Sequence, residues 1–430
     1  TITRIRFITV GIIVLAVVLI GRLYQVQVMA HEHYEAKASE QYVHTKRDLY
    51  SRGSIFFTTR DGERVSAASI QSGYVLAVDP SRVKNAEAGC AALAEHILIE
   101  TELCQVRATL PDRTYVELEQ QVSEPEATAI TALNLPGFHL YRNQWRYYPG
   151  GSMAARSIGF VGFTDDTSDT LHGKYGLERF YDDVLLREQT GHSVNFFAEI
   201  FTNLGDLVYQ RDEDQAGDIV TTLEPTVTRM LSSILAKTNE QHDSQLTGAI
   251  IMNPQTGAIY ALSAVPGFDL NDRSGATIEQ FQNPLVENVY EFGSTFKPLT
   301  VAAGLDSGAV APQTTYYDAG SIELDTFTIH NYDGRGRGTV SMQEVLNQSL
   351  NTGVAYIVDR MGKEQFREYF LNFKLGSETG IDLPNEVHGL VENLNSPRDV
   401  EYATASFGQG IAVTPIAAAR AFATLGNGGH

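Results

Sequence analysis

The pattern of apolar and polar residues changes character along the chain, and each change predicts a different kind of structure. From Phe7 to Gly21 the residues are uncharged and almost all apolar, which is typical of a membrane helix. Residues 50–83 alternate apolar and polar positions around an Asp61-Gly62 turn, which predicts a β-hairpin. Near Gly217 the pattern changes again, and we expect a domain boundary there.

Beyond this boundary the apolar residues recur at helical spacing. They predict a helix with one buried face, made of Val227, Met230, Leu231, Ile234 and Leu235. Two strands are predicted next, over 246–252 and 258–265, joined by the turn sequence Asn-Pro-Gln-Thr-Gly. We therefore expect the second domain to begin with an antiparallel hairpin packed on a helix.

The apolar segment at the amino terminus fits either a membrane anchor or a cleaved signal peptide. Counted on to Val28, it gives about 22 residues and roughly 33 Å of helix, provided that Arg22 reaches the interface. A signal peptide ends in small residues, whereas the bulky sequence RLYQVQV follows here. We expect an uncleaved single-pass anchor in the inner (cytoplasmic) membrane. Arg4 and Arg6 place the amino terminus inside and the bulk of the chain on the extracytoplasmic, periplasmic side.

Composition narrows the possible functions. A chain of 430 residues with 43% hydrophobic content forms two or three domains. The net charge of −20 argues against a nucleic-acid partner, because such binding relies on Lys and Arg at the phosphates. The two cysteines, Cys90 and Cys104, are too few to hold a metal ion, and we expect neither metal nor cofactor. Either a disulfide or two free buried thiols fits their spacing.

Candidate chemistry lies in the stretch VYEFGSTFKPLT. Ser294 and Lys297 are three residues apart, so on a helix they share a face, and Pro298 restricts this position to the first helical turn. Apolar surroundings and the positive helix end favour a neutral Lys297, as a base for Ser294 requires. The spacing alone is weak, because Ser81 and Lys84 repeat it by accident in what we predict to be a solvated turn.

A second motif supports the catalytic interpretation of Ser294 and Lys297. Ser349 and Asn351 form an S-x-N element inside an apolar segment, where a hydroxyl and an amide need partners. The two motifs occur in this order about 55 residues apart, each at the start of an apolar helix. The glycine-rich stretch DGRGRGT, residues 333–339, lacks the strand-to-helix context of a phosphate-binding loop, and we predict a surface turn.

Several ordered blocks resemble a class B penicillin-binding protein, most closely the septal, cell-division type. The blocks YEFGSTFKPLTVAAGLDSG, TVSMQEVLNQSLNTGVAYI, LGSETGIDLPNEVHGLV and ASFGQGIAVTPIAAARAFATLGNGG are similar to its transpeptidase domain, and RGSI and GLERFYDDVL to its pedestal. The resemblance implies an α+β fold. It has a transmembrane anchor over 1–30, a strand-rich pedestal of the dimerisation type over 31–217, and a transpeptidase domain over 218–430 whose antiparallel sheet carries helices on both sides.

The resemblance also implies serine acyl transfer on peptidoglycan stem peptides. Ser294 would attack the penultimate D-Ala, Lys297 would take its proton, Ser349 would pass a proton to the leaving amine, and Asn351 would bind the lysine or the substrate amide. The Ser294 amide would supply half of the oxyanion hole. Implied partners are stem peptides, β-lactam antibiotics, the membrane, a membrane-embedded glycan polymerase and other divisome proteins.

One departure from the family pattern stands out. The family's third motif, K-[ST]-G, does not occur in this sequence, and the resemblance would place it beyond His430. We therefore expect the sequence to be a piece of a longer protein, inactive as it stands. Alternatives are an elongation-type transpeptidase, a non-catalytic divisome scaffold, or a hydrolytic relative such as a carboxypeptidase, β-lactamase or antibiotic sensor.

Overall fold

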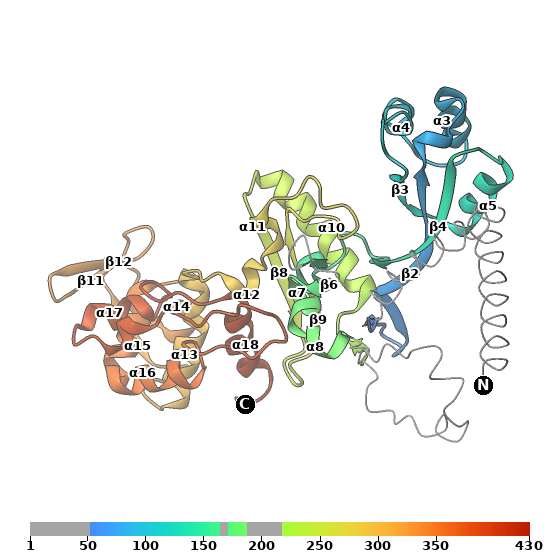
Figure 1. The fold of residues 1–430 in the computed structure, drawn as a ribbon. Helices are drawn as coiled ribbons and strands as arrows, with labels where there is room; N and C mark the ends of the chain where they lie inside the picture. Colours follow the sequence, from blue (N-terminus) through green and yellow to red (C-terminus); the bar gives the residue numbers. More distant parts are fainter. Residues whose placement is uncertain (1–51, 164–170, 187–216) are drawn as a thin grey trace, which may run out of the picture.

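The computed structural model describes residues 52–163, 171–186 and 217–430, shown in Figure 1. The predicted anchor over 1–30 lies outside these residues. Within the described ranges, no helix is both long enough and apolar enough to cross a bilayer. Helices and strands are mixed, and every strand pair is antiparallel except β1 with β7.

The amino-terminal half is organised by a five-stranded sheet with a long central strand. The first two strands pair in antiparallel fashion around the Asp61-Gly62 turn, which confirms the predicted hairpin. The central strand then pairs with two later strands, and a short strand runs parallel to the first. The strands are β1 (Ile55–Thr58), β2 (Arg64–Val78), β3 (Val116–Val122), β4 (Phe138–Tyr147) and β7 (Ile219–Val220).

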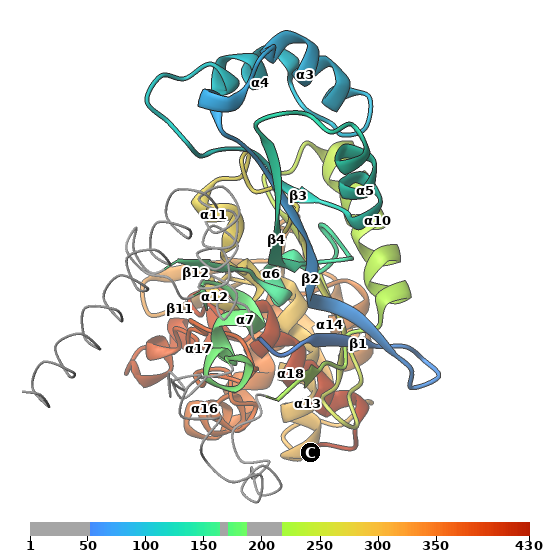
Figure 2. The same cartoon turned by 45° about the vertical axis from the view of Figure 1, so that its right-hand side comes forward.

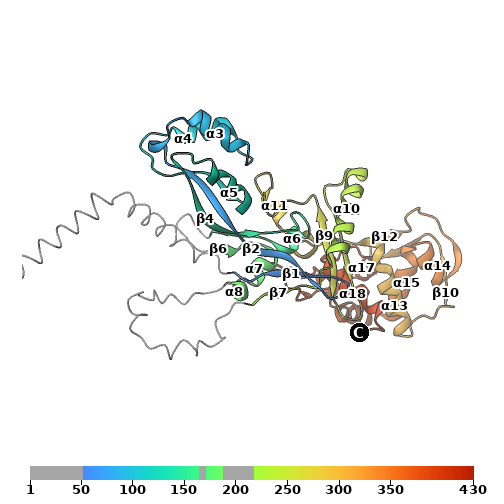
Figure 3. The same cartoon turned by 90° about the vertical axis from the view of Figure 1, so that its right-hand side faces the viewer.

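Three helices cover the far end of this sheet and form a head with its own core. They are α3 (Ala86–Ala94), α4 (Thr101–Ala108) and α5 (Glu124–Ala132). Figures 1 and 3 show this head at the opposite end of the molecule from α13 and α15. Buried Cys90 and Cys104 form a disulfide between α3 and α4, which decides between the two alternatives left open by the sequence. Ser81 and Lys84 lie exposed in the turn before α3, as predicted.

Small elements at the base of the long strands connect the sheet to the rest of the chain. They are α6 (Ala155–Ile158), β5 (Val161–Phe163), β6 (Leu171–Gly173), α7 (Gly176–Phe180) and α8 (Asp182–Leu185). The apolar core here includes residues from both sides of position 217, among them Ile55, Phe57, Leu223, Leu262 and Ile416. Figure 2 shows how β1 and the base of β2 reach this region. The base of the sheet is thereby packed firmly against the carboxyl-terminal half.

A buried charge cluster joins two of the stretches that carried the resemblance, RGSI and GLERFYDDVL. Glu178 on α7 is 0% exposed, and its two carboxylate oxygens each lie 2.7 Å from the Nε atom of a buried arginine, Arg52 and Arg146. Arg52 also lies 2.7 Å from Asp182, and Arg146 donates to the carbonyl of Gly53. These contacts connect β4 and the segment before β1 to α7 and α8.

Removing Glu178 is expected to destabilise this base strongly. Glu178→Ala removes the carboxylate shared by two buried guanidinium groups and leaves Arg146 without one, and breaking a buried pair in this way costs about 3–5 kcal/mol. Chemical denaturation followed by circular dichroism measures the loss. Glu63→Ala, which removes an exposed carboxylate beside the β1–β2 turn, is the matched control with an effect within about 0.5 kcal/mol. Equal stability of the two variants would contradict a structural role for the cluster.

The carboxyl-terminal half begins as predicted, with one correction. Helix α10 (Pro225–His242) packs on the antiparallel pair β8 (Thr247–Met252) and β9 (Ile259–Val265). The predicted buried face is partly wrong, because Met230 is 66% exposed and Ile234 is 49% exposed. The fully buried residues of α10 are Thr228 and Leu235, so the face against the strands is rotated from the one that hydrophobicity alone suggested.

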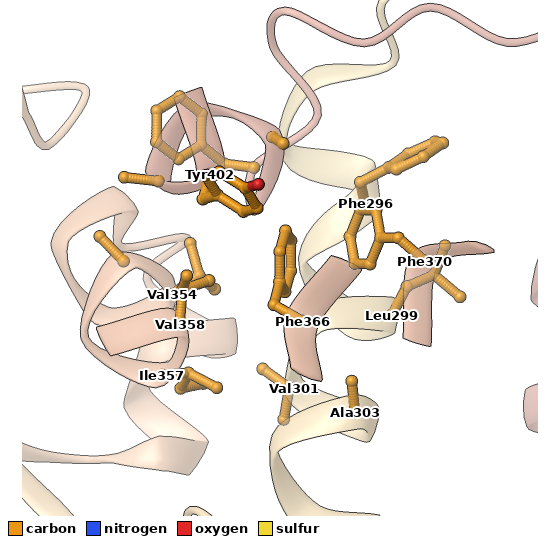
Figure 4. Close-up of a cluster of buried hydrophobic side chains, with 14 of the residues drawn as sticks. Phe296, Leu299, Val301, Ala303, Val354, Ile357, Val358, Phe366, Phe370 and Tyr402 are labelled. Carbon is orange, nitrogen blue, oxygen red and sulfur yellow. The ribbon is translucent and has the colours of Figure 1, made fainter. Parts of the chain in front are cut away.

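The remaining chain forms a helical body with small two-stranded sheets. Its main helices pack around a large apolar core, and Figure 4 shows Phe296, Val354, Phe366 and Tyr402 meeting there. The helices are α11 (Ile278–Phe281), α12 (Pro284–Glu287), α13 (Lys297–Asp306), α14 (Met342–Asn347), α15 (Asn351–Met361), α16 (Lys363–Asn372), α17 (Asp399–Ala405) and α18 (Pro415–Gly426). The strands are β10 (Thr315–Asp318), β11 (Ser321–Leu324), β12 (Phe327–His330) and β13 (Gly338–Ser341).

Candidate active site

Ser294 lies on a tight turn that leads directly into α13. A 3₁₀ turn spans Gly293–Phe296, and the Lys297 backbone amide donates to the Ser294 carbonyl. In a 3₁₀ turn, side chains three residues apart lie one above the other, so Ser294 and Lys297 project from the same side. Pro298 falls in the first turn of α13, where its missing amide proton costs nothing, as predicted. Phe296 and Leu299 are buried in the core and hold the turn in place.

Lys297 is buried and faces the second motif. The residue is 1% exposed, and its Nζ atom donates to the Ser349 hydroxyl at 3.0 Å and to the Ser349 carbonyl. Burial lowers the pKa of the Lys297 ammonium from its ordinary range to about 8, because a charged amine is poorly solvated there. Within the described part of the chain, no hydrogen bond to the Ser294 hydroxyl is found, and Ser294 is exposed. The structure thus brings Lys297 and Ser349 together and leaves Ser294 exposed on the turn that leads into α13.

Ser349 adopts a backbone conformation that is unusual for a residue with a side chain. Its φ of 52° lies in the left-handed region, which residues other than glycine seldom occupy. This conformation separates α14 from α15 and lets both the carbonyl and the hydroxyl of Ser349 accept from Lys297. Ser349 is an exposed residue whose hydroxyl contacts the Lys297 amine.

Asn351 begins α15 and contacts a neighbouring strand. Its Nδ2 atom donates to the carbonyl of His330 at 2.8 Å, at the end of β12. The described residues show no hydrogen bond between Asn351 and Lys297, so the amide is held by β12 and not by the lysine. Among the described residues no group of three His, Cys, Asp or Glu side chains could hold a metal ion.

The segment over 406–408 holds the Ser294 turn in place, and the sequence alone did not predict this contact. The Gly293 amide donates to the Gly408 carbonyl at 3.0 Å, and Thr300 donates to the carbonyl of Ser406 at 2.7 Å. A side chain at Gly408, whose φ is +70°, would place its Cβ atom 2.4 Å from the Gly293 carbonyl oxygen. Only glycine therefore fits this approach. The glycines of the SFGQG stretch were the signal in the sequence, although spacing alone could not show what they contact.

Comparison with known proteins identifies two family domains in the chain. The penicillin-binding protein transpeptidase domain family matches residues 247–430, and the penicillin-binding protein dimerisation domain family matches residues 51–200. Stage V sporulation protein D of Bacillus subtilis is 29% identical over 99% of this chain and 65% of its own length. Peptidoglycan D,D-transpeptidase FtsI of Escherichia coli is 28% identical over 97% of this chain and 70% of its own length.

A solved structure supports the fold. The crystal structure of penicillin-binding protein 2X from Streptococcus thermophilus matches 88% of this chain and 58% of that one, with a TM-score of 0.65 and 22% identity. The two family models together define the architecture of a penicillin-binding protein, with a dimerisation domain followed by a transpeptidase domain. The chain belongs to the class B penicillin-binding proteins. It spans about two thirds of the length of the curated relatives named above, 65% and 70%.

Proposed function

We propose that the protein is a serine D,D-transpeptidase that cross-links peptidoglycan stem peptides and binds β-lactam antibiotics. The observation that carries the proposal is the buried Lys297, held against Ser349 and three residues after Ser294 on one turn. An amine with its pKa lowered to about 8 can act as a base near neutral pH. The family membership and the names of the relatives support the same chemistry.

The proposed mechanism assigns one role to each group. Ser294 attacks the carbonyl of the penultimate D-Ala while Lys297 takes its proton, and an acyl-enzyme forms as the terminal D-Ala leaves. Ser349, in contact with Lys297, passes the proton to the leaving amine. Asn351 orients the substrate amide, and the Ser294 amide donates to the developing oxyanion. The amine of a second stem then attacks the ester, which forms the cross-link and frees Ser294.

Labelling with a fluorescent penicillin tests this function. The full-length protein is incubated with the probe, digested, and the labelled peptide is mapped. We expect a stable adduct on Ser294. Absence of any label would favour a non-catalytic scaffold. A label on another residue would show that Ser294 is not the nucleophile. Release of the adduct within seconds would favour a β-lactamase.

The pH dependence of acylation gives a second test of the lysine's role. Because the pKa of Lys297 is about 8, the neutral amine dominates above this pH and the ammonium below it. The second-order rate constant for acylation should therefore fall about tenfold per pH unit below pH 8 and level off above it. Stopped-flow or gel-based labelling between pH 6 and 10 measures the profile, with circular dichroism to confirm that the fold persists. A flat profile would exclude Lys297 as the base.

The cellular role and placement follow from the sequence resemblance. The protein acts at the division septum, attached to the inner membrane by the segment over 1–30, with the pedestal over 31–217 and the transpeptidase domain over 218–430 on the periplasmic side. A membrane-embedded glycan polymerase and other divisome proteins are its partners. Depletion in the source bacterium separates the alternatives. Filamentous cells support the septal role, whereas rounded or widened cells would indicate elongation.

A further inference from the structure

A cluster of buried polar side chains lies directly behind the S-x-N motif, and the mechanism gives it no role. It consists of Tyr316, Asp318, Asn331 and Thr352, whose exposed fractions are 8%, 1%, 3% and 5%. A buried carboxylate is costly unless hydrogen bonds satisfy it, and a fully satisfied network fixes the positions of its members. The cluster joins three elements far apart in the sequence, namely the end of β10, the end of β12 and the start of α15.

Asp318 is the centre of the cluster. Its Oδ1 atom accepts from the Thr352 hydroxyl at 2.7 Å, from the Asn331 amide at 2.9 Å and from the Gly320 backbone amide at 3.0 Å. Its Oδ2 atom accepts from the Arg337 backbone amide at 3.0 Å. All of these partners are donors, so the site requires a carboxylate, which only accepts when ionised.

The cluster is tied directly to the first turn of α15. Thr352 is the second residue of this helix, and its backbone amide has no partner within the helix. The side-chain oxygen of Asn331 accepts from this amide at 3.3 Å, while the preceding residue of β12, His330, accepts from Asn351 at 2.8 Å. The last residue of β12 and the residue after it therefore hold consecutive residues of α15. Ser349 lies two residues before Asn351, so the start of α15 sets its position against Lys297.

The glycine-rich stretch over 333–339 also belongs to this arrangement. Asn331 donates to the Arg335 carbonyl at 3.2 Å, and a Cβ atom at Gly336 would lie 2.7 Å from the Asp318 carbonyl oxygen. The loop thus lies against the backbone that carries Asp318. The close contact explains a glycine in this surface turn, where the sequence pattern alone gave no reason for it.

We propose that Asp318, Asn331 and Thr352 are positioning residues of the active site, which fix the start of α15 so that Ser349 faces Lys297. The proposal rests on the proposed function, because it concerns the same acylation. A displacement of about 1 Å at a reacting group can cost about a hundredfold in rate. The cluster therefore controls the rate of acylation without touching the substrate.

The matched pair Thr352→Val and Thr352→Ser tests the proposal in the full-length protein. Valine keeps the shape of threonine but leaves Asp318 without its closest donor, whereas serine keeps the hydroxyl. The rate constant for acylation by fluorescent penicillin should fall about 10- to 100-fold in Thr352→Val and stay within about threefold in Thr352→Ser. Asp318→Asn puts an amide donor where the surrounding groups also donate, so it should lower the acylation rate constant at least as far as Thr352→Val does.

The pH profile separates positioning from simple loss of stability. Looser packing at the start of α15 should let water reach Lys297, and because burial is what lowers this pKa, the midpoint of the profile in Thr352→Val should move upward from about pH 8. A purely structural residue would lower the melting temperature and leave the rate and the midpoint of the folded protein unchanged. Glu323→Gln is the control for Asp318→Asn, because it neutralises an exposed carboxylate on β11, the strand between β10 and β12 in the sequence, and should leave acylation unchanged.

The outcomes are distinguishable from failure of the proposed function. If the unaltered protein is not labelled on Ser294, the proposed function fails. If it is labelled and folded Thr352→Val acylates at the same rate with the same midpoint, the positioning role is wrong. If Glu323→Gln loses as much activity as Asp318→Asn, the effect belongs to the loss of a negative charge in this region and the proposal is likewise overturned.

Discussion

Replacing Ser294 with alanine is expected to abolish covalent labelling by penicillin. In the proposed mechanism the Ser294 hydroxyl oxygen is the atom that forms the acyl bond, whereas the Ser349 hydroxyl is occupied as the hydrogen-bond partner of Lys297. Loss of a serine nucleophile lowers acyl transfer on the order of a million-fold in a well-studied serine protease. Because Ser294 is exposed, the fold should be unaffected, with a change in unfolding free energy within about 0.5 kcal/mol.

The accidental second copy of the motif supplies the control for this experiment. Ser81 and Lys84 have the same spacing but lie exposed in the turn before α3, whereas Lys297 is buried against Ser349. Ser81→Ala should label at the rate of the unaltered protein. Labelling of Ser294→Ala on the peptide that contains position 294, measured by mass spectrometry, would show that another group is the nucleophile.

Replacing Lys297 with methionine is expected to separate catalysis from stability. Methionine fills a similar volume, and replacing a buried charge by an apolar side chain is often neutral or stabilising. The base is lost, however, and general-base catalysis contributes about 10²- to 10⁴-fold. We therefore expect acylation to fall by about 10³-fold or more while the melting temperature is kept or raised.

Two further variants sharpen the test of Lys297. Lys297→Arg retains the positive charge, but a guanidinium cannot lose its proton at accessible pH, so it should be as slow as Lys297→Met. Lys84→Met, in the accidental motif, should acylate normally. If Lys297→Arg kept more than about a tenth of the acylation rate of the unaltered protein, Lys297 would contribute to acylation through its charge and not as a base.

The fold was predicted from the sequence where local patterns decide it. The Asp61-Gly62 hairpin, the strands on either side of Asn253, and the presence of helix α10 all follow from turn residues and periodicity. The buried face of α10 was misjudged, with Met230 and Ile234 exposed, because periodicity identifies apolar positions but not the strand that packs over them. Likewise, the spacing of the cysteines left their pairing open until α3 and α4 were seen to lie side by side.

The candidate site, like the fold, was predictable from the sequence only in its local features. The two motifs and their order were readable from the chain, but the contact between Lys297 and Ser349 joins residues 52 positions apart and needs the fold. Neither the left-handed backbone of Ser349 nor the approach of Gly408 to Gly293 could be derived from spacing, since both depend on neighbours brought in by packing.

By itself, the sequence determined which groups are available and in what local structure: a serine and a lysine on one turn, and a serine and an asparagine before a buried helix. Local structure follows from sequence because hydrogen bonding and side-chain periodicity act over a few residues. Only the tertiary structure decided that Lys297 is buried away from water and hydrogen-bonded to Ser349. It also decided that Asp318 and Asn331 contact the start of α15. Burial lowers the pKa of an amine only when distant segments cover it, and no local pattern encodes that cover.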